Sequence, residues 1–234
     1  MQEKQLHLPA LPESADHRHR VAAERRGRMR SRLLRSALRL IADKGPAATS
    51  IDDVICAAGV SRGTFYKYFP SPEALVRELA AEIANELVRI TDSALYGHDD
   101  PAVMVARGLR LVASLAIRHP PVAGFLVRVG WSAQQGSNVL EFVRRDIEKG
   151  FELGRFKRMP LEMAANLVAG ATLGAIQRML ETGGAEDFSE QAAAVALRAL
   201  GVEPADIDAI ASVPLDPDAI RLVGSLAETW INAV

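Results

Sequence analysis

TSIDDVICAAGVSRGTFYKYFPSP, residues 49–72, predicts two short helices joined by a tight turn. The first helix has one apolar face, because three apolar residues follow the i, i+3, i+4 spacing of a helix: Ile51, Val54 and Ile55. Ser50 precedes this helix and Asp53 follows three residues later, as in a capping box. A helix start is therefore expected at Ser50.

The second half of the stretch fixes the turn and the second helix. Gly59 can adopt the left-handed conformation that ends a helix, and Ser61 can cap a new one only two residues later. Phe65 and Phe69 lie four residues apart and can anchor the second helix, which Pro70 stops after about two turns. Polar residues then face outward: Arg62, Thr64, Lys67 and Tyr68. This pattern predicts a helix-turn-helix, whose second helix fits the DNA major groove.

The run GVSRGTFYKYFPSPEAL, together with the preceding TSIDDVICAA, resembles the N-terminal domain of the tetracycline-repressor (TetR) family of transcription regulators over about residues 28 to 90. The resemblance implies phosphate contacts from Thr49 and Ser50 at the start of the first motif helix. Around the second helix, which Ser61 caps, it implies a DNA-facing set of six residues: Arg62, Gly63, Thr64, Tyr66, Lys67 and Tyr68. The family usually has a phosphate-contacting Lys where this chain has Pro72, so one contact per half-site is in question.

Composition excludes several classes of protein. The chain has 234 residues, 49% of them hydrophobic, and no apolar run reaches the roughly 18 residues of a membrane span. The first twenty residues lack the apolar segment of a secretory signal. A single cysteine, Cys56, cannot form an intramolecular disulfide, and we expect it to be a small buried residue. We therefore expect a cytoplasmic protein with no membrane partner.

The net charge of −1 hides an asymmetry along the chain. Residues 1–80 carry a net charge of +5, and the remainder carries −6. The positive charge is concentrated in HRHRVAAERRGRMRSRLLRSALR, just ahead of the motif. Such a run fits either a solvated helix face or a surface for a polyanion, and its place beside a helix-turn-helix favours the polyanion.

Three parts are expected along the chain. Residues 1–24 contain Pro9 and Pro12 without sustained periodicity, and predict a mobile basic tail that can touch DNA. Residues 25–94 predict a three-helix DNA-binding domain with helices at about 28–44, in the motif, and at 71–94, the last connecting to the rest. Residues 95–234 predict a larger helical domain, which the resemblance assigns to ligand binding and dimerisation. The fold class is all-α, because no segment shows β alternation.

The C-terminal part predicts several helices, bounded by Pro and Gly signals. Asp100 and Pro101 start the first, His119 interrupts it before a short helix, and residues 132–137 form a polar loop. Further helices are expected at 138–153, 160–182 and 189–200, and two short ones after Pro204 and Pro217.

The helix containing NLVAGATLGAIQRML is rich in small residues, namely Ala165, Ala169, Gly170, Ala171, Gly174 and Ala175. Small side chains allow close helix packing, so this helix and residues 192–200 can form a four-helix interface between two copies. A close contact within one chain explains the same pattern. Dimerisation is also expected from the DNA side, because one short helix reads only a few base pairs of a palindromic operator.

An apolar and aromatic set lies on several helices between residues 104 and 163, where the resemblance implies a small-molecule pocket. The candidate ligand-binding residues are Met104, Arg107, Leu111, Phe125, Arg128, Trp131, Phe142 and Met163. Gln135 is a further polar candidate, and Phe151 a further apolar one. An ordinary helical core would use the same apolar residues. The expected effector is a small apolar or aromatic compound.

Residues 59–63 match G-x-S-x-G, the nucleophile motif of α/β-hydrolases. That chemistry needs a strand before the Ser, whereas the segment before Ser61 has helical periodicity. His17 and His19 lack further ligands for a metal site, and no nucleotide-binding or zinc-protease motif occurs. We therefore predict no catalysis, metal or cofactor. Two functions stay open: a repressor released by a small hydrophobic ligand, and a DNA-binding adaptor without a small-molecule effector.

Overall fold

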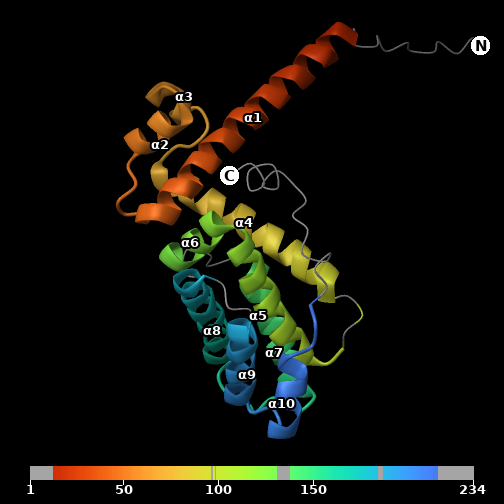
Figure 1. Cartoon of the computed structure of the whole chain (residues 1–234). Helices are drawn as coiled ribbons and strands as arrows, with labels where there is room; N and C mark the ends of the chain where they lie inside the picture. The colour runs from red at the N-terminus through yellow and green to blue at the C-terminus, as the bar shows by residue number, and fades with distance from the viewer. Residues whose placement is uncertain (1–12, 96, 98, 131–137, 184–186, 216–234) are drawn as a thin grey trace, which may run out of the picture.

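The computed structural model describes residues 13–95, 97, 99–130, 138–183 and 187–215, and every regular element in these ranges is a helix (Figure 1). The all-α prediction is confirmed. The elements are α1 (Glu13–Lys44), α2 (Ile51–Ala58), α3 (Arg62–Tyr66), α4 (Pro72–Leu95), α5 (Pro101–Arg118), α6 (Pro120–Val129), α7 (Asn138–Glu152), α8 (Leu161–Thr182), α9 (Asp187–Leu200) and α10 (Pro204–Ala211). None of these described helices combines the length and apolarity that crossing a membrane requires.

The N-terminal helix differs from the prediction. It begins at Glu13, about fifteen residues before the expected start, so the prediction of a mobile tail is wrong for residues 13–24. The apolar pattern that predicted the helix is confined to its second half, where α1 packs on other helices. The first half is mostly polar, apart from residues 21–23, and continues the same helix away from the body of the protein (Figure 1). Residues 1–12 lie outside the described range.

The helices of the C-terminal part agree closely with their Pro and Gly signals. The Asp100 side chain accepts a hydrogen bond from the Ala102 backbone N–H at 2.8 Å, which caps α5. The α5–α6 break falls at His119, and Gly183 ends α8 in the left-handed conformation. The expected loop at 132–137 and the last short helix after Pro217 lie outside the described residues.

One apolar cluster joins the helix-turn-helix to the larger part. It contains Leu34 of α1, Phe65 of α3 and Leu87 of α4, and continues into Phe125 of α6 and Ile176 of α8. A second cluster fills the space between α5, α7, α8, α9 and α10. The first cluster therefore crosses residue 95, where the sequence predicts a boundary between parts.

The end of α1 and α6 pack closely against one another. A β carbon on Gly124 would lie 2.7 Å from the backbone oxygen of Ala42, so only glycine fits there without movement. Arg128 donates a hydrogen bond from Nε to the same oxygen at 2.8 Å. This contact, together with α4, connects the motif helices to the C-terminal helices.

Candidate DNA-binding surface and effector cavity

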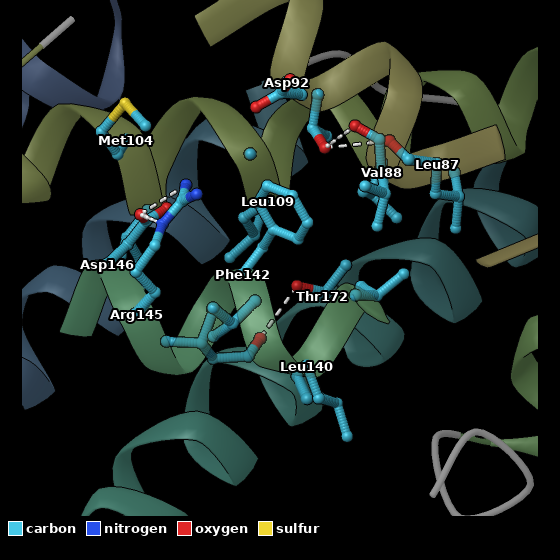
Figure 2. Close-up of a pocket in the computed structure, with 18 of the residues that line it drawn as sticks. Leu87, Val88, Asp92, Met104, Leu109, Leu140, Phe142, Arg145, Asp146 and Thr172 are labelled. Carbon is cyan, nitrogen blue, oxygen red and sulfur yellow. Dashed lines mark hydrogen bonds and ion pairs between the residues drawn. The ribbon is translucent and has the colours of Figure 1, made fainter. Parts of the chain in front are cut away.

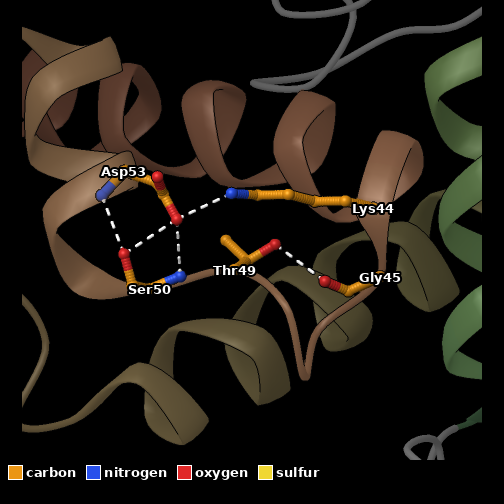
Figure 3. A network of polar contacts seen from close by, with 5 residues as sticks. All are labelled: Lys44, Gly45, Thr49, Ser50 and Asp53. Carbon is orange, nitrogen blue, oxygen red and sulfur yellow. Dashed lines mark hydrogen bonds and ion pairs between the residues drawn. The ribbon is translucent and has the colours of Figure 1, made fainter.

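The start of α2 is held by a network of short hydrogen bonds (Figure 3). Ser50 Oγ accepts from the Asp53 backbone N–H at 3.1 Å, and the Ser50 N–H donates to Asp53 Oδ2 at 2.9 Å, which confirms the capping box. Lys44, from the last turn of α1, donates to the same carboxylate at 2.7 Å. The Lys44 and Ser50 hydrogen bonds hold the pKa of Asp53 well below its usual range.

The turn and the second motif helix follow the predicted chemistry. Gly59 has φ +60° and ends α2, and the Ser61 side chain accepts from the Thr64 backbone N–H at 3.2 Å. Phe65 and Phe69 are fully buried, with ring centroids 5.9 Å apart. The helix is shorter than predicted: α3 ends at Tyr66, although the Phe69 N–H still donates to Phe65 O at 3.0 Å.

The outer side of α3 carries most of the predicted DNA-facing residues. The exposed ones are Ser61, Arg62, Gly63, Tyr66 and Lys67, while Thr64 is half-buried. Tyr68 departs from the prediction that it faces away, because it is half-buried and packs against the first apolar cluster. Cys56 is exposed on α2, so the prediction of a buried cysteine is wrong.

Arg62 is engaged within the protein. Its Nη2 donates to both carboxylate oxygens of Asp52, at 2.7 and 2.8 Å, and the two side chains are 57% and 70% exposed. Asp52 also raises the pKa of Arg62. The ion pair links α2 to α3 on the outer surface of the motif, where water and ligands can compete for it.

Thr49 and Ser50 use their hydroxyl protons within their own loop. Thr49 Oγ1 donates to Gly45 O at 2.8 Å, and Ser50 Oγ donates to Asp53 Oδ2 at 2.8 Å. A hydroxyl has one proton to donate, so either residue must release its present acceptor before donating to a phosphate. Further along, Ser71 Oγ accepts from the Ala74 N–H at 3.2 Å, and Pro72 is the first residue of α4.

A cavity of about 240 Å³ lies among α4, α5, α7 and α8 (Figure 2). Its lining is mostly aliphatic, with Met104, Leu109 and Val112 from α5 and Phe142 from α7. Leu87, Val88 and Thr91 of α4 form another wall. The helix that begins beside the motif therefore also borders this cavity.

Polar groups reach the cavity on two sides. Asp92 comes from α4, and Arg145 and Asp146 come from α7, with Arg145 Nη2 3.1 Å from Asp146 Oδ1. Burial raises the pKa of Asp146, against the opposing effects of Arg145 and Lys149. The Arg145 guanidinium also lies 4.5 Å from the centroid of the Phe142 ring. The cavity thus offers a mainly apolar space with carboxylates at its edge.

Sequence reasoning located this cavity only in part. Met104 and Phe142 line it, but five other candidates do not. Leu111 and Phe125 belong to the apolar core, Arg128 binds Ala42 O, and Met163 is 62% exposed on α8. Arg107 is also absent from the lining, and Trp131 and Gln135 lie outside the described residues. The sequence did not identify Asp92, Asp146 and Thr172 as lining residues. They are polar residues on amphipathic helices, and such residues usually face solvent.

Two family comparisons cover most of the chain. Residues 33–79 match the bacterial regulatory proteins of the tetR family, and residues 100–213 match the tetracyclin repressor-like C-terminal domain. Among solved structures, RolR in complex with resorcinol is 32% identical with a TM-score of 0.65, over 83% of this chain and 98% of that one. The chain belongs to the TetR family. The helix-turn-helix lies in the first matched part, and the cavity walls from α5, α7 and α8 lie in the second.

Other comparisons extend this result. The HTH-type transcriptional regulator EthR of Mycolicibacterium smegmatis is 34% identical over 106 residues, which are 45% of this chain and 47% of that protein. The chain thus spans about half the length of this curated TetR-type relative. A protein named glycerol-3-phosphate dehydrogenase, from Afipia carboxidovorans, is 32% identical over 142 residues, 38% of its length. Dinucleotide-binding domains need a parallel sheet, and the described part of this chain is helical throughout its regular elements.

The small residues of α8 divide between two faces. Ala165, Ala169 and Ala175 are buried against neighbouring helices of the same chain, whereas Gly170 and Gly174 face outward. A β carbon on either glycine would meet no described atom within 4 Å. Exposed apolar residues also lie on α8 and α9: Met163, Leu180 and Val195. Close packing within one chain therefore explains the alanines, but it does not explain the two glycines.

Proposed function

We propose that this protein is a homodimeric DNA-binding repressor that a small hydroxylated aromatic compound releases from a palindromic operator. The observation that carries the proposal is the outer face of α3, which presents basic and phenolic side chains while two buried phenylalanines fix the helix. We assign DNA binding to residues 25–94, and effector binding and dimerisation to residues 95–234. A repressor of chromosomal operators would act in the cytoplasm.

On the DNA side, Arg62 and Lys67 are the proposed base readers, because Arg can pair bidentately with guanine in the major groove. Tyr66 is a proposed phosphate contact that positions α3 in the groove, because its exposed hydroxyl can donate a hydrogen bond to a phosphate oxygen. Thr49 and Ser50 are proposed to contribute after exchanging their loop acceptors for a phosphate. Pro72 starts α4 in place of a basic residue, so the half-site is held without that contact.

The proposed dimer interface is the outward face of α8 and α9. Gly170 and Gly174 would allow the α8 helices of two copies to approach closely, and the exposed Met163, Leu180 and Val195 would be covered. Two α3 helices would then lie about one helical turn of DNA apart, as two half-sites require.

The effector class follows from the size and chemistry of the cavity. At about 240 Å³ it is smaller than the roughly 300–1,000 Å³ of drug-sized sites, which favours a single-ring compound. Carboxylates accept hydrogen bonds, so Asp92 and Asp146 suit a ligand with hydroxyl donors on an apolar ring. The resorcinol bound to RolR is a compound of this kind, in a relative 32% identical to this chain.

The dimer would have two conformations that differ in the spacing of the two α3 helices. Release from DNA requires the ligand to bind the conformation whose spacing does not match the half-sites more tightly than the one that does. α4 suits this role, because its C-terminal half lines the cavity while Glu78 and Glu82 near its start pair with Arg30 of α1. Each tenfold loss of operator affinity needs about 1.4 kcal/mol of preference for the second state.

The test is operator binding with and without ligand. A footprint on the DNA upstream of the gene identifies the operator, and fluorescence anisotropy then measures affinity with resorcinol, catechol, phenol and benzene. We expect hydroxylated rings to weaken binding and benzene to have less effect. Asp146→Asn should reduce the response to the diphenols while leaving operator affinity intact. If no aromatic compound stabilises the protein or alters DNA binding, the adaptor function is favoured instead.

A further inference from the structure

A stripe of arginines runs along one face of α1, exposed at Arg25, Arg28, Arg32 and Arg39 and half-buried at Arg35. Arg25, Arg28, Arg32, Arg35 and Arg39 are separated by three, four, three and four residues, and residues so spaced share one face of a helix. The buried residues of the same helix are Leu33, Leu34, Ala37, Leu38 and Ile41. At about 100° per residue, the two sets lie on roughly opposite sides of α1. We call the five arginines the α1 stripe.

The α1 stripe passes beside the DNA-binding motif. The Arg32 guanidinium lies against Gly59, so that a β carbon there would be 2.8 Å from Arg32 Nη2. Gly59 is the turn between α2 and α3. Arg28 and Arg25 continue from this point toward the free end of α1, which projects past α2 and α3 on the side away from the C-terminal helices (Figure 1).

The N-terminal arginines of the stripe have no acidic partner. Arg25, Arg28 and Arg32 are exposed and form no ion pair with any described residue. Arg30, on another side of the helix, pairs with Glu78 and Glu82 of α4. Like charges at this spacing destabilise a helix by about 0.2–0.5 kcal/mol per pair, so the arrangement opposes folding unless an anion binds there.

The length of α1 also argues for a partner. Residues 13–32 form about 30 Å of helix, at 1.5 Å per residue, before the segment that matches the family begins at residue 33. A mostly polar helical segment with few tertiary contacts is only marginally stable in water. A regular row of positive charges on such a helix complements the regular row of phosphates of a nucleic-acid backbone.

We propose that the α1 stripe is a second DNA contact, in which Arg25, Arg28 and Arg32 bind backbone phosphates beyond those reached by α3. Arg25 and Arg32 are seven residues apart, or about 10 Å of helix, which is about the rise of three base pairs along the duplex axis. The contact adds affinity for any sequence and lengthens the protected region. The proposal rests on the DNA-binding function but not on the operator or the effector.

The test compares two double variants of the full-length protein on a 30-base-pair duplex of random sequence. Arg25→Gln with Arg28→Gln removes two charges from the α1 stripe. Arg20→Gln with Arg26→Gln removes two exposed charges from the same part of α1, on its other sides. Gln has nearly the helix propensity of Arg, so the helix is preserved, and circular dichroism checks this. Affinity is measured from 50 to 200 mM salt.

We expect the stripe variant to lose about 0.9 in salt slope for each lost contact, or about 1.8 per protomer. The ratio of wild-type to variant affinity should therefore be about tenfold larger per protomer at 50 mM salt than at 200 mM. The Arg20 and Arg26 variant should keep the wild-type slope. Equal loss in both variants, or none in either, overturns the proposal.

Two further outcomes separate this inference from the proposed function. If the stripe variant loses slope on random DNA while no operator is found, the stripe contact stands and sequence-specific repression fails. If the stripe variant loses binding to anionic vesicles but keeps its salt slope on DNA, the stripe binds a membrane surface and the proposal is wrong.

Discussion

Arg62 and Asp52 form an ion pair between the two motif helices, with Arg62 Nη2 2.7 Å from Asp52 Oδ1. The side chain proposed to read a base is thus held by a carboxylate in the DNA-free protein. To pair with guanine, Arg62 must give up this partner, and the freed carboxylate then stands close to the DNA. Asp52 therefore competes with DNA phosphates for Arg62. It favours complexes in which a guanine base takes its place as the partner of Arg62.

The first prediction concerns Asp52. Asp52→Asn should raise affinity for random duplex up to about fivefold, because an exposed ion pair contributes about 0–1 kcal/mol. Operator affinity should rise less, so the specificity ratio falls. Asp43→Asn is the matched control, since it removes one exposed charge from the end of α1. Competition binding measures both ratios; equal gains in the two variants would contradict a role for Asp52 in specificity.

The second prediction separates base reading from phosphate binding. Arg62→Ala should lose about 1–3 kcal/mol of discrimination at one operator position. Lys67→Gln would behave likewise if it reads a base, whereas as a phosphate contact it would weaken all sequences and lower the salt slope by about 1. Affinities for single-base operator variants distinguish these patterns. Unchanged preference in Arg62→Ala would remove Arg62 from the recognition set.

A third prediction concerns dimerisation. Gly174→Leu should give monomers that still fold, since the added side chain meets no atom within 4 Å of its β carbon in one chain. Gly27→Leu is the control, because Gly27 is also helical, exposed and open. Each change raises helix propensity by about 1 kcal/mol, so monomer stability should not fall. Analytical ultracentrifugation decides; a dimeric Gly174→Leu protein would place the interface elsewhere.

The fourth prediction follows from the pKa of Asp146. Because burial raises this pKa in the folded state, the folded protein binds the proton more tightly than the unfolded chain does. The contribution of Asp146 to the free energy of unfolding therefore decreases as pH rises from its unfolded pKa, near 3.9, through the raised folded value. Asp146→Asn should be more stable than wild type at pH 7, and the difference should shrink toward pH 4. Urea titrations at both pH values measure it.

The fifth prediction tests the contact between α6 and α1. Gly124→Ala forces a methyl group against the Ala42 carbonyl, which should lower the free energy of unfolding by about 1–3 kcal/mol. The separation of α6 from α1 should also weaken the effect of ligand on operator affinity. Gly27→Ala, at an exposed helical glycine with no atom within 4 Å of its β carbon, is the comparison for the intrinsic effect of the methyl group. If ligand lowers the operator affinity of Gly124→Ala by the same factor as that of wild type, the α1–α6 contact does not transmit the effect of the ligand.

The sequence predicted local structure well where each signal is local. Ser50, Gly59 and Ser61 lie at helix ends as their chemistry requires, since caps depend on a few adjacent residues. The early start of α1 was missed because its first half has no apolar face, which is the signal that identifies a helix in a sequence. The Asp52–Arg62 pair was missed for another reason: it joins residues whose helices meet only after the turn has formed.

The cavity was the least predictable feature. Phe125 and Phe142 are similar residues in the sequence, yet one is fully buried core and the other lines a space. The difference depends on how four helices pack, and no spacing within one helix records it. Asp146 can be predicted as a lining residue only if it is known that its side of α7 faces α4 and α5 rather than solvent.

The apolar cluster that runs from Leu34 through Phe65 and Leu87 to Ile176 limits how this regulator can be re-engineered. A chimera joined at residue 95 would pair halves of two different interiors and would leave mismatched surfaces inside the molecule. New operator preferences are better obtained by exchanging only the outer residues of α3, because these changes leave the shared interior as it is.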